Sequence, residues 1–239
     1  MTRLTVSENY KNYSNVEYVK NCLNEILTHT KSTVNFNKTG DRIECVIECS
    51  DGYSDIIKSE LIDKIAEIIA INYKYTYYKN QIKVAGLTTD EKEILYASLI
   101  AADLDADKKY CYAKCKDFND IAIDGAYNFY LSPLKKKWED VVSYMPACFI
   151  NSQLKDFITY LLENKKKKIY IDGEKVFDTH FRRLKRTDLL GGENVKIIRE
   201  VLLSNCGEIE LSGTLPREDE KYLREFYGDK ITFSQRYWG

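Results

Sequence analysis

Basic side chains concentrate in one stretch of the sequence, residues 165–186. Nine bases and three acids lie there, which leaves a net charge of +6 in a chain whose net charge is −1. Tyr170 and Phe181 add aromatic rings to the same stretch. This combination could hold the phosphates of RNA or DNA, or an anionic lipid surface. The candidate anion-binding residues are Lys165, Lys166, Lys167, Lys168, Lys175, Arg182, Arg183, Lys185 and Arg186.

The same charges also have a structural explanation. Lys165 to Lys168 follow an amphipathic helical pattern, and cations are favourable at the negative C-terminal end of a helix. Charged side chains also keep an exposed hairpin solvated. The sequence therefore leaves two interpretations open, an anion-binding surface and a set of helix-end and surface charges.

Two cysteine pairs have a spacing that could supply metal ligands. Three residues separate Cys45 from Cys49, and three separate Cys111 from Cys115. Four thiolates can bind zinc tetrahedrally, but structural zinc sites often place only two residues between paired cysteines. Cys45 and Cys49 also share the apolar face of a predicted strand with two isoleucines. Because free cysteine packs well as a small hydrophobe, we expect core packing, with no metal and no cofactor.

The run from Asp103 to Asp107 begins like a calcium-binding loop, with acids at alternate positions. Such a loop needs a glycine at its sixth position and a bidentate glutamate at its twelfth. Lys108 and Lys114 occupy those two positions. We therefore interpret these acids as the solvated part of a helix.

A catalytic centre built on histidine would have to use His29 or His180, the only two in the chain. No nucleophile elbow or similar local signature accompanies either one. Gly191 and Gly192 precede a predicted helix and could direct backbone N–H groups at an anion. They lack the surrounding glycine-rich phosphate-binding frame, so a helix-entry loop is expected. We predict no catalytic residue and a protein that is not an enzyme.

Length and composition restrict the class of protein. With 239 residues, 44% of them hydrophobic and 31% charged, the chain suits one large globular domain or two small ones. Its N-terminus has no apolar core of a secretory signal, and its longest uncharged apolar run, Val141 to Ile150, is too short to span a bilayer. Seven cysteines, an odd number spread along the chain, indicate reduced thiols. We expect a cytoplasmic protein without a membrane span.

The elements that must position these residues begin with a small sheet. Arg3 to Val6 predicts a strand, and apolar residues at helical spacing predict a helix from Ser14 to about Thr28. Thr33 to Phe36 and Arg42 to Cys49 predict a hairpin. The N-terminal fifth of the chain is therefore expected to be a β-α-β-β unit.

Helices dominate the predicted middle of the chain. One starts near Ser54, a second at Thr89, a third at Ser132 and a fourth at Asn151 or Ser152. Asp124 and Gly125 are typical of a turn between the second and third.

Strands and helices alternate in the C-terminal part. A strand at Ile169 to Ile171 is followed by a hairpin through Asp172-Gly173. A helix from Asn194 to Ser204, a strand at Glu208 to Leu211, a helix opened by Pro216 and a strand at Lys230 to Phe233 complete the pattern. Strand, helix and strand in so few residues predict a parallel pair, and we expect Ile169 to Ile171 in the same sheet.

Several short runs resemble the YtxC-like putative sporulation proteins of endospore-forming bacteria. They are DGAYNFYL at residues 124–131, KDFITYLL at 155–162, the closing run from Leu202 to Leu211, and FYGDKI at 226–231. The resemblance covers residues 90–234 in the order of elements. It implies a cytoplasmic protein linked to spore formation, and it provides no catalytic residue.

These observations predict an α+β protein with a small N-terminal β-α-β-β unit at residues 1–52, a helical region at 53–164 and a C-terminal α/β unit with a short mixed sheet at 165–239. We expect the three to form one compact body. The leading functional hypothesis is a non-catalytic interaction protein with a protein partner, associated with sporulation by resemblance. The alternative is a nucleic-acid or phosphate-binding module that uses residues 165–186.

Overall fold

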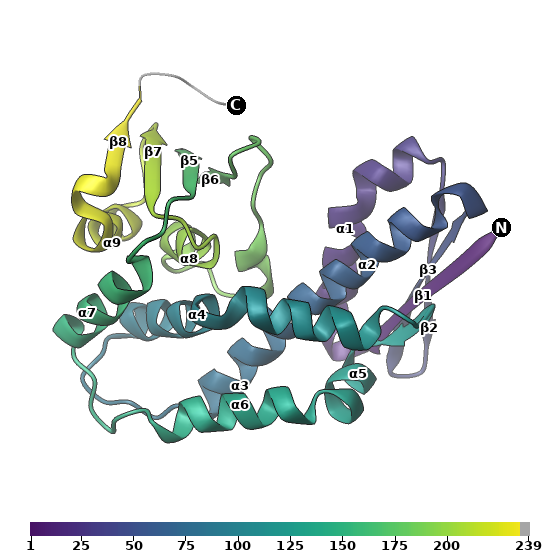
Figure 1. Ribbon diagram of the computed structural model, residues 1–239, viewed down its shortest axis with the longest axis horizontal. Coiled ribbons are helices and arrows are strands. Elements are labelled where there is room, and N and C mark those ends of the chain that lie inside the picture. The colour runs from purple at the N-terminus through teal and green to yellow at the C-terminus, as the bar shows by residue number, and fades with distance from the viewer. Residues whose placement is uncertain (235–239) are drawn as a thin grey trace. The chain divides into compact units, whose positions relative to one another are not determined.

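The computed structural model describes residues 1–234 and confirms an α+β fold with two four-stranded sheets (Figure 1). The described part of the chain divides into two units built from interleaved segments. Unit 1 contains residues 1–74 and 105–143, and unit 2 contains residues 75–104 and 144 onwards. These limits differ from the expected divisions after residues 52 and 164, because contacts far apart in the sequence define each unit.

Unit 1 contains the predicted β-α-β-β arrangement. Its sheet has the order β2-β3-β1-β4, in which β1 pairs antiparallel with β3 and parallel with β4. Helices α1 and α2 lie side by side against one face of this sheet (Figure 1). The strands are β1 (Thr2–Asn9), β2 (Thr33–Thr39), β3 (Arg42–Cys49) and β4 (Asp120–Ala122), and the two helices are α1 (Tyr13–His29) and α2 (Ser54–Ile68).

Alternation along the strands places the core of unit 1 between sheet and helices. Ile43, Cys45, Ile47 and Cys49 of β3 are buried as predicted, and Val6 of β1 joins them. Glu44 and Glu48 lie on the other face, where they stay partly accessible to solvent. One face therefore supplies the apolar contacts that hold α1 and α2.

The helices of the middle region start at the predicted residues, but the first of them is interrupted. After α2 the chain makes a π-helical turn, Ile69–Tyr73, before α3 (Lys74–Gln81), while α4 (Thr89–Cys115) runs without a break. The turn predicted at Asp124-Gly125 is wrong. Both residues lie in α5 (Ile123–Tyr130), where the Asp124 carboxylate accepts the Gly125 N–H and pairs with Arg42. Two more helices follow, α6 (Ser132–Ser143) and α7 (Asn151–Leu162).

Unit 2 contains the predicted parallel pair. Its sheet has the order β6-β5-β7-β8, with β7 parallel to both β5 and β8 and β6 antiparallel to β5. The expected strand at 169–171 therefore belongs to the same sheet. The elements are β5 (Lys168–Asp172), β6 (Lys175–Phe177), α8 (Lys196–Leu203), β7 (Glu208–Ser212), α9 (Arg217–Tyr227) and β8 (Ile231–Phe233).

Short 3-10 turns connect several of these elements. They are η1 (Tyr10–Asn12), η2 (Asp51–Tyr53), η4 (Arg186–Leu189) and η5 (Gly228–Lys230). Of these, η4 bears on the basic segment, because it begins at the last of the nine candidate residues.

Candidate functional site

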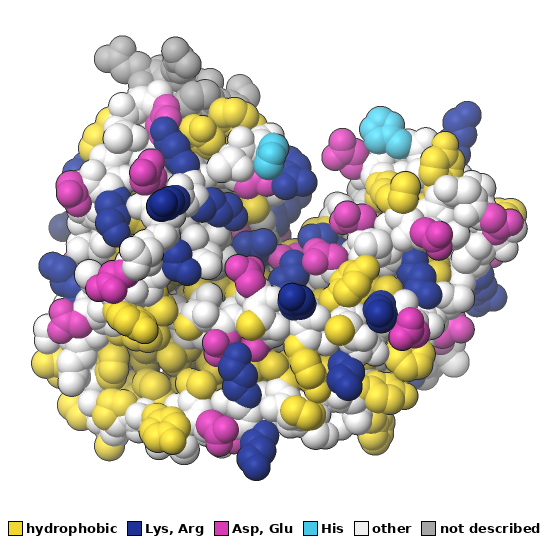
Figure 2. Space-filling model, in the orientation of Figure 1, with side chains coloured by type: hydrophobic (Ala, Val, Ile, Leu, Met, Phe, Trp, Pro, Cys, Tyr) yellow, Lys and Arg dark blue, Asp and Glu magenta, His cyan; other side chains and the backbone are white. Residues whose placement is uncertain are grey.

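The basic segment, residues 165–186, runs along the β6 edge of the unit 2 sheet. Lys168 is the first residue of β5, and Lys175 opens β6 at the opposite end of that hairpin. Arg183 then pairs with Phe177 of β6 through a single antiparallel bridge. The nine candidate residues are thus distributed along both ends and one edge of the sheet. On the face of unit 2 seen in Figure 2, basic and acidic side chains are interspersed.

Two of the nine cations stabilise the end of a helix. Lys167 Nζ donates to the Ser204 carbonyl at 3.1 Å, and Arg186 Nη1 donates to the Leu203 carbonyl at 2.9 Å. Both carbonyls lie at the C-terminal end of α8, where positive charge offsets the helix dipole. For Lys167 and Arg186 the helix-end interpretation therefore applies, and the helix concerned is α8.

Two further cations have acidic partners. Lys168 lies 2.8 Å from Glu210 on the neighbouring strand β7, and Arg182 lies 2.8 Å from Asp178. The Glu210 contact raises the pKa of Lys168. Burial opposes ionisation of Asp178, yet hydrogen bonds from Arg182 and from the His180 N–H hold its pKa below the usual range. These four internal contacts reduce the positive charge that the segment can offer to a ligand.

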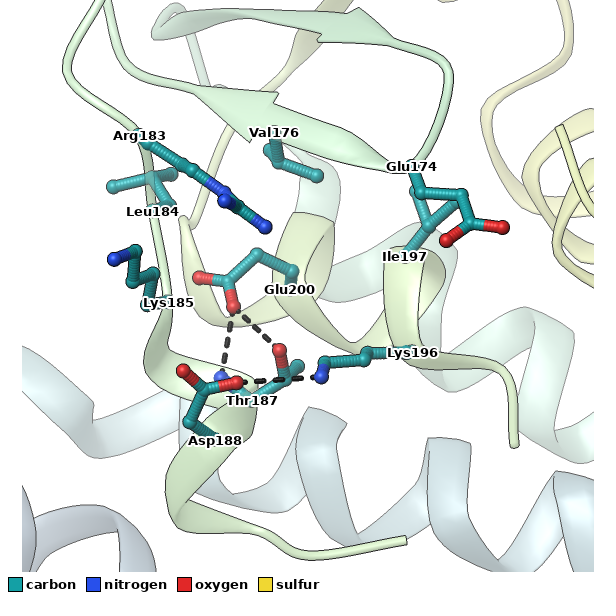
Figure 3. Close-up of a pocket in the computed structure, with 10 residues that line it drawn as sticks. All are labelled: Glu174, Val176, Arg183, Leu184, Lys185, Thr187, Asp188, Lys196, Ile197 and Glu200. Carbon is teal, nitrogen blue, oxygen red and sulfur yellow. Dashed lines mark hydrogen bonds and ion pairs between the residues drawn. The ribbon is translucent and has the colours of Figure 1, made fainter. Parts of the chain in front are cut away.

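Arg183 and Lys185 line a small pocket between η4 and α8 (Figure 3). The pocket has a volume of about 40 Å³, enough for a few water molecules. Its charged lining is balanced, with three bases and three acids. They are Arg183, Lys185, Lys196, Glu174, Asp188 and Glu200.

Glu200 shapes this pocket by holding η4 in place. Its carboxylate accepts hydrogen bonds from the Thr187 N–H and hydroxyl, both at 2.8 Å, and burial raises its pKa (Figure 3). Lys196 lies 3.3 Å from Asp188 on the other side. Since both acids have partners within the wall, the geometry fits a hydrated structural pocket.

A wider, open pocket of about 610 Å³ adjoins the first at the N-terminal ends of α8 and α9. Five acids and three bases line it: Asp90, Glu174, Glu193, Glu218, Asp219, Arg183, Lys196 and Arg217. Asp219 accepts the Ile198 N–H at 2.8 Å, and burial raises its pKa. A carboxylate therefore already occupies the N-terminus of α8, and an anionic ligand gains nothing there.

The Gly191–Gly192 loop directs carbonyl groups, and not N–H groups, at a charged partner. Arg199 donates to the Gly191 carbonyl at 3.0 Å and to the Gly192 carbonyl at 2.9 Å. The Arg199 guanidinium is buried and also lies 3.3 Å from Glu93. The loop thus enters α8 through contacts to this arginine, in keeping with its predicted structural role.

The other sequence candidates lie in separate places. Cys45, Cys49, Cys111 and Cys115 are buried, and burial raises the pKa of Cys45 and of Cys115 to about 11. Both histidines are exposed at the surface. Asp103 to Asp107 are helical residues of α4, but the expectation that all these acids are solvated is wrong for Asp107, which is buried against Lys74.

Among residues 1–234, no three His, Cys, Asp or Glu side chains are grouped so as to hold a metal ion. No helix described there is long and apolar enough to cross a membrane.

An apolar strip between α6 and α7, residues 144–150, was not predicted as a site. Its sequence is YMPACFI, and Tyr144 is 86% exposed and Ile150 48% exposed. The strip is fixed at its centre, since Ala85 N donates to the Ala147 carbonyl and Phe149 N donates to the Ala85 carbonyl, both at 2.9 Å. The strip is the second part of Val141 to Ile150, the longest uncharged apolar run in the chain, which is too short to span a bilayer.

Gly86 allows the strip to lie this close to its neighbour. Gly86 has φ +89°, and a Cβ at this position would lie 2.9 Å from the Phe149 carbonyl oxygen. At the far end, Ile150 N donates to Gln153 Oε1 at 3.0 Å, which joins the strip to the first turn of α7. The 144–150 strip is thus an exposed apolar segment in a defined conformation.

Comparison with known proteins adds no assignment to this site. No family model, no curated protein and no solved structure matches the chain.

Proposed function

We propose that this chain is a non-catalytic interaction protein that binds an apolar surface of a protein partner through the 144–150 strip. The observation that carries the proposal is a run of seven consecutive uncharged residues, five of them exposed and two half-buried, in a conformation fixed by backbone pairing. Exposed apolar patches of this kind mark interaction surfaces. Tyrosine and other aromatic anchors contribute strongly to such interfaces.

Preorganisation of the strip favours binding. A segment that is already ordered loses little conformational entropy when a partner covers it. Tyr144 can bury its ring while its hydroxyl stays at the rim of an interface. Because the strip has no charge, attraction to the partner should depend on buried apolar area and persist when salt screens electrostatic interactions.

The cellular setting belongs to the same proposal. The free thiols of the structure suit the reducing cytoplasm. The resemblance of the runs between residues 124 and 231 to YtxC-like proteins supports an association with spore formation. Neither point depends on the identity of the partner.

Site-specific photo-cross-linking in the host cell tests the interaction. A photoreactive phenylalanine analogue replaces Tyr144 in the full chain, and the same analogue at Phe129, 78% exposed in unit 1, is the matched control. We expect a discrete cross-linked protein from position 144 that survives about 1 M salt during lysis. No cross-link at 144, or the same products from 129, contradicts the proposal.

A double variant tests the interaction, and a gene deletion tests its cellular role. Cys148 is the one exposed cysteine among the described residues, and a thiol photocross-linker attached to it should also capture the partner. The double variant Y144S with I150S should abolish this cross-link.

Deletion of the gene should lower the count of heat-resistant spores without slowing vegetative growth. Normal spore counts would reject the association with sporulation and leave the interaction to be judged by the cross-links.

A further inference from the structure

The edge strand β2 of the unit 1 sheet leaves one side open to further pairing. Within the described chain it pairs with β3 alone, over seven residues in a continuous register without a bulge. The other sheet edges among residues 1–234 are β4, β6 and β8, with three residues each. Long regular edges attract further strands, and proteins usually shorten or bulge them, or place charges and prolines on them. β2 has a single charge, Lys38, and no proline.

The hairpin geometry determines which backbone groups of β2 point outward. A two-residue loop, residues 40–41, joins β2 to β3, so Thr39 and Arg42 exchange both of their backbone hydrogen bonds. Because hydrogen-bonded and non-hydrogen-bonded pairs alternate, every second residue back from Thr39 also bonds to β3. The residues between them direct their N–H and C=O groups away from the sheet. These outward residues are Val34, Phe36 and Lys38.

The sequence of β2 is nearly the same in both directions. TVNFNKT has a threonine at each end, an asparagine on each side of the centre and Phe36 at the centre, and only Val34 and Lys38 differ. A second copy of β2, paired antiparallel about Phe36, places threonine opposite threonine, asparagine opposite asparagine and Phe36 opposite itself. Lys38 then faces Val34, so no like charges are directly opposed. Matched threonines and aromatic rings stabilise neighbouring strands, and all three outward residues of each copy form both of their backbone hydrogen bonds in this register.

Charges and aromatic rings around β2 also suit a second copy. Continued beyond the strand ends, the same register brings Lys31 towards Asp41 of the second copy, and both side chains are exposed. Phe36 lies 6.3 Å from Tyr13 of α1, and Tyr13 lies 6.0 Å from Tyr10, measured between ring centroids. Tyr10 is 44% exposed and Tyr13 38% exposed. A two-fold axis at Phe36 brings the two sets of rings together on one side of the sheet, where they bury apolar surface.

We infer that this chain forms a two-fold dimer in which β2 of each copy pairs antiparallel with β2 of the other, centred on Phe36. The two unit 1 sheets then form one continuous sheet, and β2 is no longer an edge. The interface is isologous, because the same strand contributes from both copies. Backbone hydrogen bonds provide the attraction, and the matched side chains determine the register. This inference is independent of the partner that covers the 144–150 strip.

Sedimentation equilibrium of the full chain, at concentrations from about 1 to 300 µM, measures dimerisation. Two double variants test the register at Asn35 and Asn37, which are exposed and lie opposite each other across the inferred interface. N35K with N37K places lysine opposite lysine on both sides of the axis and should weaken the dimer roughly ten-fold. N35D with N37K is the matched control, because it differs only at position 35 and opposes unlike charges. It should dimerise at least as tightly as the parent chain.

A proline variant tests the backbone pairing. K38P removes an outward N–H but none of the hydrogen bonds between β2 and β3, so it should also weaken the dimer. Thermal melting followed by circular dichroism checks that each variant stays folded, and the double variants at exposed positions decide the matter if K38P lowers stability. A parent chain that stays monomeric over the whole concentration range, or equal dissociation constants for the two double variants, would overturn the inference.

Discussion

Two acidic side chains in unit 1 are buried where the sequence offers no local partner. Asp107 of α4 accepts Lys74 Nζ at 2.7 Å, Trp138 Nε1 at 3.0 Å and Lys137 Nζ at 3.0 Å. Lys74 is 0% exposed and Asp107 1% exposed. Such a pair adds little net stability over an apolar equivalent, but the loss of one partner leaves an uncompensated buried charge.

D107A should therefore be strongly destabilising. Removal of the carboxylate takes an ionic partner from the buried Lys74 ammonium, at a cost of about 3–5 kcal/mol in the free energy of unfolding. Denaturant unfolding measures this change. The double variant K74M with D107L removes both charges and should be clearly more stable than D107A; equal losses would show that charge burial is not the cause.

Glu8 is the second buried acid. It lies on the inward face of β1, fully buried, and accepts the Tyr73 hydroxyl of the π-helical turn at 2.7 Å. Asn15 of α1 donates to the same carboxylate at 3.4 Å, and Asp124 of α5 adds a nearby negative charge. Burial is the main reason that the pKa of Glu8 lies above its ordinary value of 4.5.

This shift predicts a pH dependence of stability. Because the folded-state pKa is raised, the contribution of Glu8 is complete below about pH 4.5 and is lost as the pH rises through the raised pKa. E8Q should gain on the parent chain as the pH rises towards neutral, by on the order of 1 kcal/mol. Urea unfolding of both proteins across this pH range measures the difference. E44Q, on the opposite face of the sheet, is the control and should show a constant difference; the same constancy for E8Q would contradict the assignment.

At the scale of elements, the start of β7 depends on a glycine that the sequence does not distinguish from others. Gly207 N donates to the Lys167 carbonyl at 2.8 Å, so that β7 enters the sheet beside β5. A Cβ at Gly207 would overlap the Lys165 carbonyl oxygen. The basic segment and β7 can therefore approach each other only where this side chain is absent.

G207A should destabilise unit 2 by about 1–3 kcal/mol, because the backbone at Lys165 must move to accommodate the added methyl group. Thermal or denaturant unfolding gives the change. G52A is the matched control, since a Cβ at Gly52 meets nothing within 4 Å, and it should change stability by no more than about 0.5 kcal/mol. Similar values for the two variants would contradict the role of this close approach.

At the scale of the whole molecule, each unit depends on segments from separate parts of the sequence. Unit 2 needs residues 75–104 as well as the C-terminal part. Residues 75–104 supply Glu93, which pairs with the buried Arg199, and Ala85, which fixes the 144–150 strip. The expected division after residue 164 would separate Glu93 from Arg199.

A fragment of residues 144–239 should therefore fail to fold cooperatively, because Arg199 would lose its carboxylate partner and the apolar surface that residues 75–104 cover would be exposed. Circular dichroism during thermal unfolding detects the absence of a cooperative transition. A chain with residues 105–143 replaced by a flexible linker retains every segment of unit 2 and should unfold cooperatively. A sharp transition in the 144–239 fragment would show that the C-terminal part is autonomous.

The elements themselves were largely predictable from the sequence. Alternation in β3 and the apolar stripe of α8 follow from backbone geometry, which sets periods of two and 3.6 residues whatever the surroundings. The exceptions have local causes. A glycine after Asp124 suggested a turn, but the pairing of Asp124 with Arg42, 82 residues away, stabilises a helix start.

The sequence by itself determined the α+β class, the parallel pair β7–β8 and the concentration of positive charge at residues 165–186. Only the tertiary structure decided how each charge is used. Lys167 and Arg186 reach the end of α8, which lies 37 and 17 residues further along the chain, while Arg182 stays at the surface beside Phe181. The physical reason is that periodicity is a property of neighbouring residues, whereas the partner of a charge depends on which distant elements pack beside it.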